Sequence, residues 1–417
     1  MPNNTSTKIL NQIKMWLFCI GLGAVVGIIV WTFLKLMSFG VEVIWHEIPA
    51  KINFPFYTLI ICAVGGLIIG LLHKFCGDYP EELEVVLGKI KTEKTYNYKK
   101  MAPMLLLALL PLLIGSSVGP EAGLTGIIVA LCYWMGDNIK SAFINVKKYS
   151  KVGLAATLNV MFRSPLFGIF AVEEGDEPDT SGIKKSEKLI LYGLSTAGVI
   201  ATYLLLSKFF GSGMSGFPTF PVTPLAFKDY LMVLVYVPCG CILALFYNLT
   251  HKYIHKLVRK LPVILRECIG GICLGIMGTV LPILMFSGEH EMGLLIAGSY
   301  SYLPAVLILI AFLKILLTNV CISTGLRGGH FFPVIFAGVC LGYGVSMLLF
   351  PGGGHEVFAA AVITATLLGG IMKKPLAVTV LLFICFPVRL FFWIFIAATI
   401  GKAIMGLPFK KTNAQHE

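Results

Sequence analysis

The sequence predicts an all-α membrane protein made of two related halves with inverted topology and many tilted or broken helices. Three observations support this fold class. Of the 417 residues, 57% are hydrophobic and only 13% are charged, and the mean hydropathy is +0.86, unlike an ordinary soluble domain. Apolar stretches recur along the whole chain, many of them interrupted by Gly and Pro. Glycine and proline motifs return at matching intervals in the two halves.

The first membrane helix is predicted at residues 15–34, MWLFCIGLGAVVGIIVWTFL, which carry no charge over 20 positions. Twenty residues at about 1.5 Å each match the roughly 30 Å hydrocarbon core of a bilayer. The preceding residues are polar and the run lacks a small-residue cleavage site, so we interpret it as a retained helix rather than a signal peptide.

Further helical membrane segments are predicted from the apolar stretches that follow, many of which are shorter than 20 residues. The 11 cysteines lie mostly inside such runs without the spacing of a metal site or of disulfide pairs, and we interpret them as buried thiols. The predicted segments are residues 55–74, 101–115, 121–136, 152–173, 187–207, 229–249, 263–286, 302–322, 330–350, 357–372, 375–387 and 389–406.

The net charge of +12 is explained by membrane topology, so binding of nucleic acid is not expected. Basic loops at 89–100, 140–151 and 251–260 are predicted to face the cytoplasm by the positive-inside rule. The connections at 39–53 and 209–226 are poor in Lys and Arg and are predicted to lie outside. Both termini are then cytoplasmic, and we expect no separate soluble domain.

An internal repeat is indicated by the spacing of short motifs. Gly119 begins GPEAG and Pro165 begins PLFGIF, while Gly329 begins GHFFP and Pro375 begins PLAVTV, and both intervals are 46 residues. Two glycines precede these motifs by 42 and 41 residues, Gly77 and Gly288. We therefore predict one membrane domain over 1–417, with repeat one at about 15–175, repeat two at about 228–406, and a site where the halves meet.

The glycine loops are predicted to form an anion site. At the start of a broken helix, free backbone N–H groups and a partial positive charge favour an anion. Gly119, Gly123 and Gly126 allow close approach of the backbone, and Pro120 suits a first helical turn. Several such helix starts would hold an anion without the fixed charge of Lys or Arg, and weak holding is what passage requires.

Glu121 is the acid inside this glycine loop. Insertion of an acid at the middle of a membrane costs about 2.5 to 3.5 kcal/mol, so a carboxylate retained there is a candidate functional group. Because the carboxylate is itself an anion, it can occupy the helix-start site and leave when protonated or displaced. This makes Glu121 a candidate gate and proton carrier; the alternative is a carboxylate that caps its own helix or faces a loop.

These motifs resemble those of the CLC family of chloride channels and proton-coupled transporters. GSSVGPEAGL resembles the glycine-flanked glutamate motif of that family, RSPLFGIFAVEE its following proline and double-glutamate stretch, and GLRGGHFFPVIFAGVCLG its G-x-F-x-P segment. The resemblance covers residues 15–405 and is greatest to a short bacterial branch without nucleotide-sensing domains. It implies a multi-pass protein of the bacterial cytoplasmic membrane, surrounded by lipid, and a homodimer with one pathway per chain.

The resemblance also implies roles for single residues. Glu121 falls at the external gating glutamate, Glu174 at the internal proton-transfer glutamate, and Phe331 at the filter phenylalanine. Taken alone, the acidic stretch after Glu173 would be interpreted as a solvated helix end. The expected anion-binding positions are Gly77, Asp78, Gly119, Pro120, Ala122, Gly123, Gly329, His330, Phe331, Phe332 and Met405.

Three positions differ from the pattern of the family. Gly77 stands where a serine usually supplies a hydroxyl, Asp78 follows it and would repel an anion unless protonated or turned away, and Met405 replaces the central tyrosine. Chloride is the expected anion, with fluoride as an alternative, although the Asn-containing loop of fluoride exporters is not found. His330 is expected either to tune the site by protonation or to serve packing.

Other functions are considered less favourable. GMSG at Gly213–Gly216 fits the motif of an intramembrane serine hydrolase, but it lies in a Pro- and Gly-rich connection. A metalloprotease would need H-E-x-x-H, and Glu289–Glu291 are interpreted as a short polar loop. Within transport, Glu121 and Glu174 provide the two protonatable stations that chloride/proton antiport needs, and a passive channel or uniporter is the alternative. No metal or organic cofactor is implied, and no enzymatic activity is expected.

Overall fold

Helices make up nearly all of the described chain. The computed structural model describes residues 4–52, 54–81, 85–86, 98–138, 150–174, 185–211, 218–298 and 302–407. The elements in chain order are α1 (Asn4–Glu42), η1 (Val43–Glu47), α2 (Ile48–Lys51), α3 (Tyr57–Cys76), α5 (Met101–Leu113), α6 (Glu121–Asn138), α7 (Ser150–Met161), α8 (Phe167–Glu173), α9 (Lys185–Phe210), α10 (Phe227–Val258), α11 (Val263–Val280), η3 (Pro282–Leu284), α12 (Glu289–Ile296), α13 (Pro304–Thr324), α14 (Phe331–Leu349), α15 (Glu356–Met372), α16 (Pro375–Leu382), η4 (Val388–Leu390) and α17 (Phe391–Gly406).

Eight helices of the described part are long and apolar enough to cross a membrane. Three shorter apolar helices, Met101–Leu113, Glu121–Met135 and Glu356–Met372, are too short to do so alone. The short helices lie inside the bundle, and α15 is buried over nearly its whole length. Backbone that ends within the membrane must be covered by protein, so these broken helices need the longer ones around them.

The long helices approach each other closely through glycines. A Cβ atom added at Gly66 of α3 would lie 2.5 Å from the carbonyl oxygen of Glu267 in α11. A Cβ atom at Gly23 of α1 would lie 2.1 Å from the carbonyl oxygen of Ser195 in α9. In a bilayer, where lipid is as apolar as the protein, such close backbone packing is a main source of association between helices.

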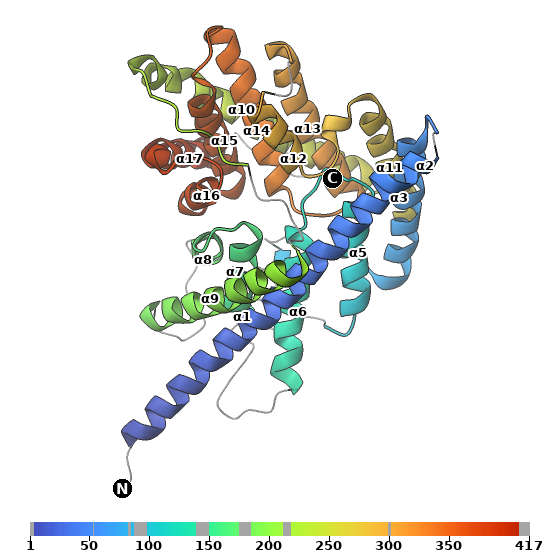
Figure 1. Ribbon diagram of the computed structural model, residues 1–417. Coiled ribbons are helices and arrows are strands. Elements are labelled where there is room, and N and C mark those ends of the chain that lie inside the picture. Colours follow the sequence, from blue (N-terminus) through green and yellow to red (C-terminus); the bar gives the residue numbers. More distant parts are fainter. Residues whose placement is uncertain are drawn as a thin grey trace, which may run out of the picture.

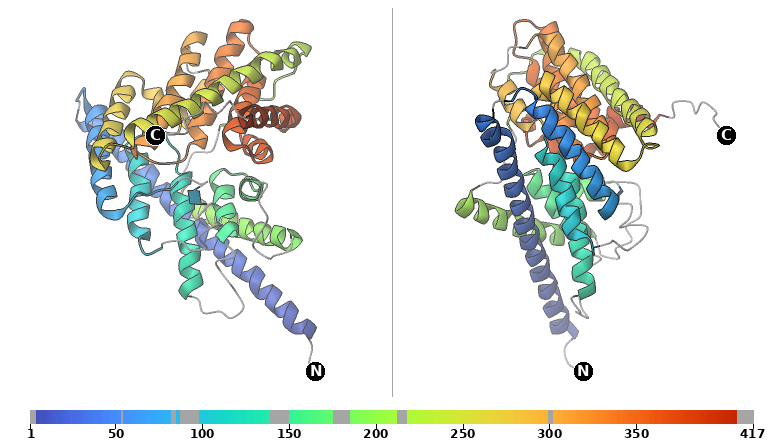
Figure 2. Two further views of the ribbon diagram at one scale, coloured as in Figure 1. Left: turned by 180° about the vertical axis from the view of Figure 1, so that it is seen from behind. Right: turned by 90° about the vertical axis from the view of Figure 1, so that its right-hand side faces the viewer.

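Most helices of the two halves lie in two separate groups, whereas α3 of the first half packs on α11 of the second. In Figure 1, α6 to α9 lie in the lower group, α10 and α12 to α17 lie in the upper group, and α1 runs diagonally along the molecule. Figure 2 shows the same division from two other sides. The segments before α6 and before α14 meet between the groups in an isolated antiparallel bridge between Gly119 and Gly329. The motif-bearing loops of the two halves are therefore in direct contact.

Three predictions about the connections were wrong. Residues 39–53 were expected to be a connection, but α1 continues to Glu42 and is followed by η1 and α2. No glycine or proline interrupts residues 41–48, so nothing ends the helix there. Residues 289–291 begin α12 instead of forming a loop, because Gly288 takes a left-handed conformation and two acids then lie favourably in a first helical turn. The expected loop at 251–260 is largely the end of α10.

Candidate anion and proton site

The site begins with two helix starts that are held together by their preceding glycines. The amide of Gly119 donates to the carbonyl of Gly329, and the amide of Gly329 donates to the carbonyl of Gly119, both at 2.7 Å. Helix α6 starts two residues later at Glu121, and α14 starts two residues later at Phe331. Because each glycine amide donates to the carbonyl of the other glycine, the amides of the following residues provide the free donors.

The side chain of Glu121 crosses from its own helix to the other one. Its Oε1 accepts a hydrogen bond of 3.0 Å from the amide of Phe331, at the N-terminus of α14. The residue is 2% exposed, and Oε2 has no hydrogen-bond partner among the described residues. A helix N-terminus carries a partial positive charge, so this carboxylate occupies a position suited to any small anion.

Glycine is required at both loops because the Glu121 side chain fills the space beside them. A Cβ atom added at Gly329 would lie 1.7 Å from the carboxyl carbon of Glu121. One added at Gly119 would lie 2.1 Å from Oε2 of Glu121 and 2.6 Å from the ring of Phe332. Only glycine at these two positions leaves room for the Glu121 side chain in its observed place.

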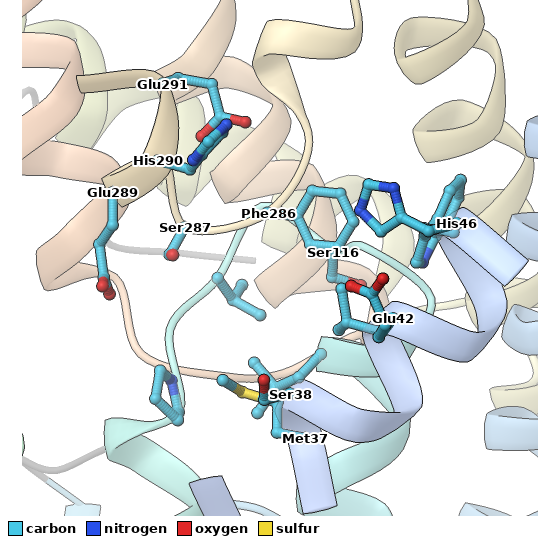
Figure 3. A pocket seen from close by; sticks show the side chains of 15 residues that line it. Met37, Ser38, Glu42, His46, Ser116, Phe286, Ser287, Glu289, His290 and Glu291 are labelled. Atoms are coloured by element: carbon cyan, nitrogen blue, oxygen red, sulfur yellow. The ribbon is translucent and has the colours of Figure 1, made fainter. Parts of the chain in front are cut away.

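A vestibule of about 480 Å³ leads to this site. Figure 3 shows Glu42 and His46 on one side, from α1 and η1, and Glu289, His290 and Glu291 of α12 on the other. Its remaining lining residues are Met37, Ser38, Val41, Trp45, Leu112, Ser116, Val118, Pro120, Phe286 and Ser287. Pro120 lines the vestibule and directly precedes Glu121, whose own side chain is not part of the vestibule wall.

Glu289 is electrostatically linked to Glu121 and was not predicted as a site residue. Burial, followed by the nearby charge of Glu121, raises the pKa of Glu289 to about 8, while Arg163 acts in the opposite direction. Another vestibule residue, Ser116, has a buried Oγ without a hydrogen-bond partner among the described residues. The sequence offered one signal for Glu289, because it follows Gly288, the repeat counterpart of Gly77.

On its other side Glu121 borders a cavity of about 10 Å³, close to the volume that one water-sized particle needs. Nε2 of His330, in the cavity wall, is buried and has no hydrogen-bond partner among the described residues. The ring of Phe332 stacks on Phe162 at 4.8 Å, which fixes the first turn of α14. The cavity is lined by Glu121, Ala122, Thr125, Leu158, Gly328, Gly329, His330 and Phe331.

The lining shows which predicted residues come together. The structure gathers Glu121, Ala122, Gly329, His330 and Phe331 around the small cavity. Phe332 and Gly119 adjoin the carboxylate, and Pro120 lines the vestibule. Gly123 faces the other way, since a Cβ atom added there would lie 2.5 Å from the Cβ atom of Ala108 in α5. Gly123 therefore serves the packing of α6 on α5.

Glu174 follows α8 and binds the N-terminus of α16. Its Oε1 accepts from the amide of Leu376 at 3.0 Å and its Oε2 from the amide of Ala377 at 2.7 Å. The two helices belong to opposite halves, as α6 and α14 do. Residues 175–179 of the acidic stretch lie outside the described residues. Glu174 is thus a second carboxylate at a helix start, separate from the cavity beside Glu121.

Gly77, Asp78 and Met405 do not line the cavity beside Glu121. Gly77 ends α3 with φ +108, and Lys100 donates to the neighbouring carbonyl of Cys76 at 2.8 Å. The Asp78 carboxylate, half exposed, pairs with Arg327 at 2.7 Å and lies 3.7 Å from Arg266. These guanidinium groups compensate its charge, which explains how an acid is accommodated at this position.

Met405 lies in α17 beside α10 and α15. A Cβ atom added at Gly370 would lie 2.8 Å from Cγ of Met405, and the amide of Asn248 lies 3.9 Å from its sulfur. The side chain thus fills a gap between helices, as methionine often does. It offers no donor to an anion, so any hydroxyl contact expected at this position is absent.

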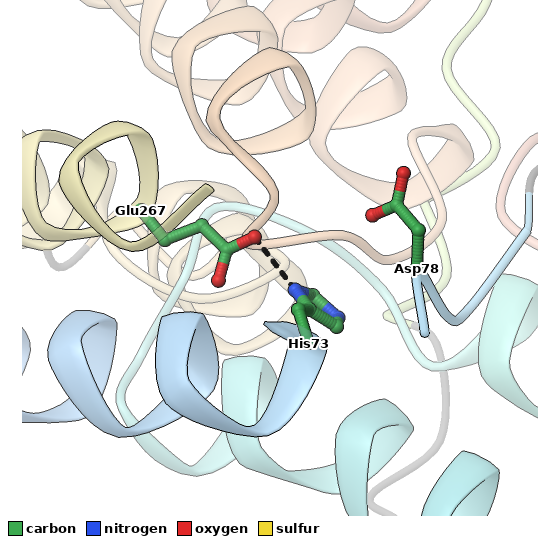
Figure 4. Close-up of side chains that lie close together, drawn as sticks. All are labelled: His73, Asp78 and Glu267. Carbon is green, nitrogen blue, oxygen red and sulfur yellow. Dashed lines mark hydrogen bonds and ion pairs between the residues drawn. The ribbon is translucent and has the colours of Figure 1, made fainter. Parts of the chain in front are cut away.

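His73, Asp78 and Glu267 form the group of possible metal ligands in the described residues, with atoms within 4.8 Å of one another. Figure 4 shows His73 directed at Glu267, with Nδ1 2.6 Å from Oε1, and Asp78 set apart. Arg266 lies 3.1 Å from Glu267 and also approaches Asp78. Guanidinium groups on both acids already supply the positive charge, so the cluster fits an ion-pair network rather than a metal site.

Lys314 is a buried cation that the sequence did not reveal as part of the site. Its Nζ donates to three successive carbonyls, those of Leu284, Met285 and Phe286, at 2.8 to 3.0 Å. It also lies 5.5 Å from the centroid of the Phe336 ring. Because Phe286 lines the vestibule, Lys314 holds that wall against α13 and α14.

Broken helices with facing N-termini, in a bundle of membrane-spanning helices, define an ion-transport protein of the membrane. A family model described as voltage gated chloride channel matches residues 65–406, and the chain belongs to this family, the CLC family. The ion-transport proteins it resembles include "Putative ion-transport protein YfeO" of Escherichia fergusonii, 23% identical over 333 residues that cover 78% of this chain and 77% of the relative. The YfeO protein of Salmonella schwarzengrund is 24% identical and covers 74% of each chain.

Solved structures share the fold at low sequence identity. A slow cyanobacterial Cl−/H+ antiporter has a TM-score of 0.76 at 18% identity and covers 94% of this chain and 95% of its own. A CLC-type fluoride/proton antiporter has a TM-score of 0.73 at 19% identity with the same coverage. The predicted all-α, inverted-repeat fold is therefore confirmed. The alternative hydrolase motif at Gly213–Gly216 lies outside the described residues.

Proposed function

We propose that the protein exchanges chloride for protons across the bacterial cytoplasmic membrane. The observation that carries this proposal is the Glu121 carboxylate, buried and bound by the amide of Phe331 at the start of α14. A charged carboxylate in that position competes directly with a small anion for the same helix start. One side chain can therefore link the presence of a proton to the presence of an anion.

The exchange follows from the charge of Glu121. While ionised, the carboxylate remains at the helix start and excludes the anion. A proton that arrives through the vestibule neutralises it, weakens its attraction to the helix N-terminus and lets the side chain leave. The anion then takes the amide of Phe331, and return of the carboxylate expels the anion and releases the proton.

Glu174 is the proposed inner proton station. Its carboxylate accepts hydrogen bonds from two amides of α16, at the start of a helix of the other half. Coupled exchange needs a second protonatable group through which the proton reaches the cytoplasm, because Glu121 is the proposed outer station. The proton would pass between the two carboxylates while the anion site is occupied, and it would leave to the cytoplasm at Glu174.

The orientation places the vestibule outside. Helix α1 starts at the predicted cytoplasmic N-terminus, and its other end, at Met37–Glu42, lines the vestibule. The end of α10, with the basic residues 251–260, then faces the cytoplasm. We further propose a homodimer with one pathway in each chain, as the resemblance to the CLC family implies.

Fluoride is a second candidate substrate. The positions of the expected serine and tyrosine hydroxyls are taken by Gly77 and Met405, so the site relies on amides, aromatic edges and His330. A relative in fold is a CLC-type fluoride/proton antiporter. Small anions differ in dehydration cost, and a site with few hydroxyl donors leaves the choice between them to the backbone amides.

The test is simultaneous measurement of chloride, fluoride and proton movement by the purified protein in liposomes. An imposed chloride gradient is expected to drive protons uphill, and Glu121→Gln is expected to abolish proton movement while anion flux remains. Glu47→Gln, an exposed acid that does not line the vestibule, is the control and is expected to behave as wild type. Anion flux without any proton movement in the wild type would instead establish a channel or uniporter.

A further inference from the structure

Four aromatic rings form a continuous line from the small cavity towards the cytoplasmic end of α10. The ring of His330 lies 5.8 Å from that of Tyr247, Tyr247 lies 6.1 Å from His251, and His251 lies 6.2 Å from His255. The last three residues are spaced by four along α10, so they share one face of that helix. We call these four residues the ring ladder.

The ladder contains two imidazole nitrogens without partners. Nε2 of His330 and Nδ1 of His251 are both buried and have no hydrogen-bond partner among the described residues. The His330 residue is 9% exposed and lies in the wall of the cavity beside Glu121. A buried polar atom left unpaired destabilises the protein, so two of them in one line indicate a ligand that passes there.

The surroundings of the ladder favour an anion. Asn319 of α13 donates to the carbonyl of Tyr247 at 3.0 Å and to Oγ1 of Thr250 at 2.7 Å, which fixes α10 at the level of the ladder. Met405 of α17 approaches at Asn248 and is uncharged. At the cavity end of the ladder the carboxylate is that of Glu121. Near its other end, the charged residues of α10 are basic: Lys252, Lys256 and, just beyond the helix, Arg259 and Lys260.

We propose that the ring ladder lines the cytoplasmic half of the anion route, with His330 and His251 as the anion-binding donors. A proton on Nε2 of His330 and on Nδ1 of His251 lets each ring donate one hydrogen bond to a passing halide. These donors take over the role of the hydroxyls that Gly77 and Met405 do not provide. Because a neutral imidazole carries no fixed charge, the anion is held weakly enough to move on.

This inference rests on the proposed anion transport and assigns its inner route, which the sequence alone did not locate. Tyr247 and His251 are missed by motif reasoning because their spacing along α10 also fits an ordinary packed helix face. Only the approach of His330 from the other side, on the loop before α14, connects them to Glu121. The route therefore depends on the contact between α10 and the start of α14.

The test compares donor-retaining and donor-free substitutions. Gln can place an amide N–H near the position of Nε2, whereas Leu keeps bulk without a donor. His330→Leu is expected to weaken chloride binding about tenfold, measured by titration calorimetry with sodium chloride on purified protein, and to slow chloride uptake by liposomes. His330→Gln is expected to stay within about threefold of wild type. Tyr253→Leu, on an exposed face of the same helix, is the control.

The same comparison is made with His251→Leu and His251→Gln. If His330→Leu does not fold, these two variants test whether a side-chain donor is needed for chloride binding. Equal binding by the Leu and Gln variants of both histidines, whether normal or weakened, would overturn the proposal, because the donor would then be irrelevant. Normal chloride binding with loss of proton movement in the Leu variants would also overturn it and make the ladder a proton route. Anion transport by the wild-type protein is measured first. If it moves neither chloride nor fluoride, the proposed function itself is wrong.

Discussion

At the scale of single residues, the position of the Glu121 side chain depends on the absence of a side chain at Gly329 and Gly119. The three atoms nearest to a Cβ added at Gly329 belong to the Glu121 side chain, which is flexible. A methyl group at Gly329 can therefore displace the carboxylate without moving the backbone around it. The glycine then acts on transport through Glu121 rather than through the stability of the fold.

Gly329→Ala is expected to reproduce the effect of Glu121→Gln, with proton movement lost and anion flux retained. Stability should change by less than about 1 kcal/mol, because only a flexible side chain must move. The double variant Gly329→Ala with Glu121→Gln should add nothing to either single change. Liposome flux and thermal unfolding in detergent measure the two quantities. Gly193→Ala, with open space around its added Cβ, is the control, and additive effects in the double variant would contradict the displacement.

Glu289 is expected to give anion uptake a dependence on outer pH. Its pKa is raised to about 8 by burial and by the charge of Glu121, so it is mostly neutral below that pH and becomes charged above it. A new negative charge in the vestibule repels anions, and uptake should fall as outer pH rises through about 8. Glu289→Gln should remove this fall, measured as initial chloride uptake at a series of outer pH values.

The control for that measurement is Glu47→Gln, an exposed acid that does not line the vestibule. Glu289→Gln with an unchanged pH profile would show that another group sets the dependence. His46, His290, Glu42 and Glu291 also line the vestibule, so removal of the fall by Glu289→Gln alone would assign the pH dependence to Glu289.

At the scale of elements, helix N-termini of one half bind carboxylates from the other half. Glu121 binds the start of α14, and Glu174 binds the start of α16. The second arrangement gives Glu174 a structural role beside the proposed transport role. The structural and the transport role can be tested separately. A helix cap needs only a hydrogen-bond acceptor, whereas proton transfer needs an acid.

Glu174→Ala is expected to lower stability by about 1 to 2 kcal/mol, because two amides of α16 lose their acceptor. Glu174→Gln keeps one acceptor oxygen and should cost less than Ala. Both variants should lose proton movement while anion flux continues. Unfolding curves and liposome flux on the same preparations separate the roles. Persistent proton movement in Glu174→Gln would place the inner station at another residue.

The buried contact between His73 of α3 and Glu267 of α11 is expected to contribute strongly to stability. Glu267→Leu leaves His73 without its partner and should cost about 3 to 5 kcal/mol, whereas the double variant with His73→Leu should recover much of the loss. Asp78→Asn, in a half-exposed pair, should cost less than about 1 kcal/mol. Denaturant unfolding in detergent measures the stability of all three variants. A larger loss of stability for Asp78→Asn than for Glu267→Leu would contradict the greater contribution expected of the buried pair.

Helices formed by long apolar stretches could be predicted from the sequence, whereas a helix that begins with polar residues could not. Helices α3, α5, α13 and α17 follow their apolar stretches closely because burial in lipid or protein requires it. Helix α12 was missed because Glu289 and Glu291 resemble a loop, although acids suit a first helical turn. Glu121 was found through its glycines, whereas Tyr247 and His251 could not be found, since only tertiary contacts bring α10 to His330.

At the scale of the whole molecule, the site exists only where the two halves meet. The bridge between Gly119 and Gly329 joins the loops of the halves, and Glu121 and Glu174 each bind a helix of the opposite half. The vestibule is likewise lined by α1 and α12, which lie far apart in the sequence. We propose that a pathway made in this way is complete within one chain.

That completeness predicts independent function of the two subunits in the proposed homodimer. A tandem fusion of two copies is expected to be feasible because both termini are predicted on the cytoplasmic side, so a flexible linker can join them. A tandem with Glu121→Gln in one copy should keep full anion flux and lose about half of the proton movement of the wild-type tandem, because only one Glu121 remains. Size measurement in detergent first establishes that each tandem forms one closed pair. Complete loss of proton movement from the mixed tandem would mean that the two chains share a proton path, and the single-chain pathway would have to be abandoned.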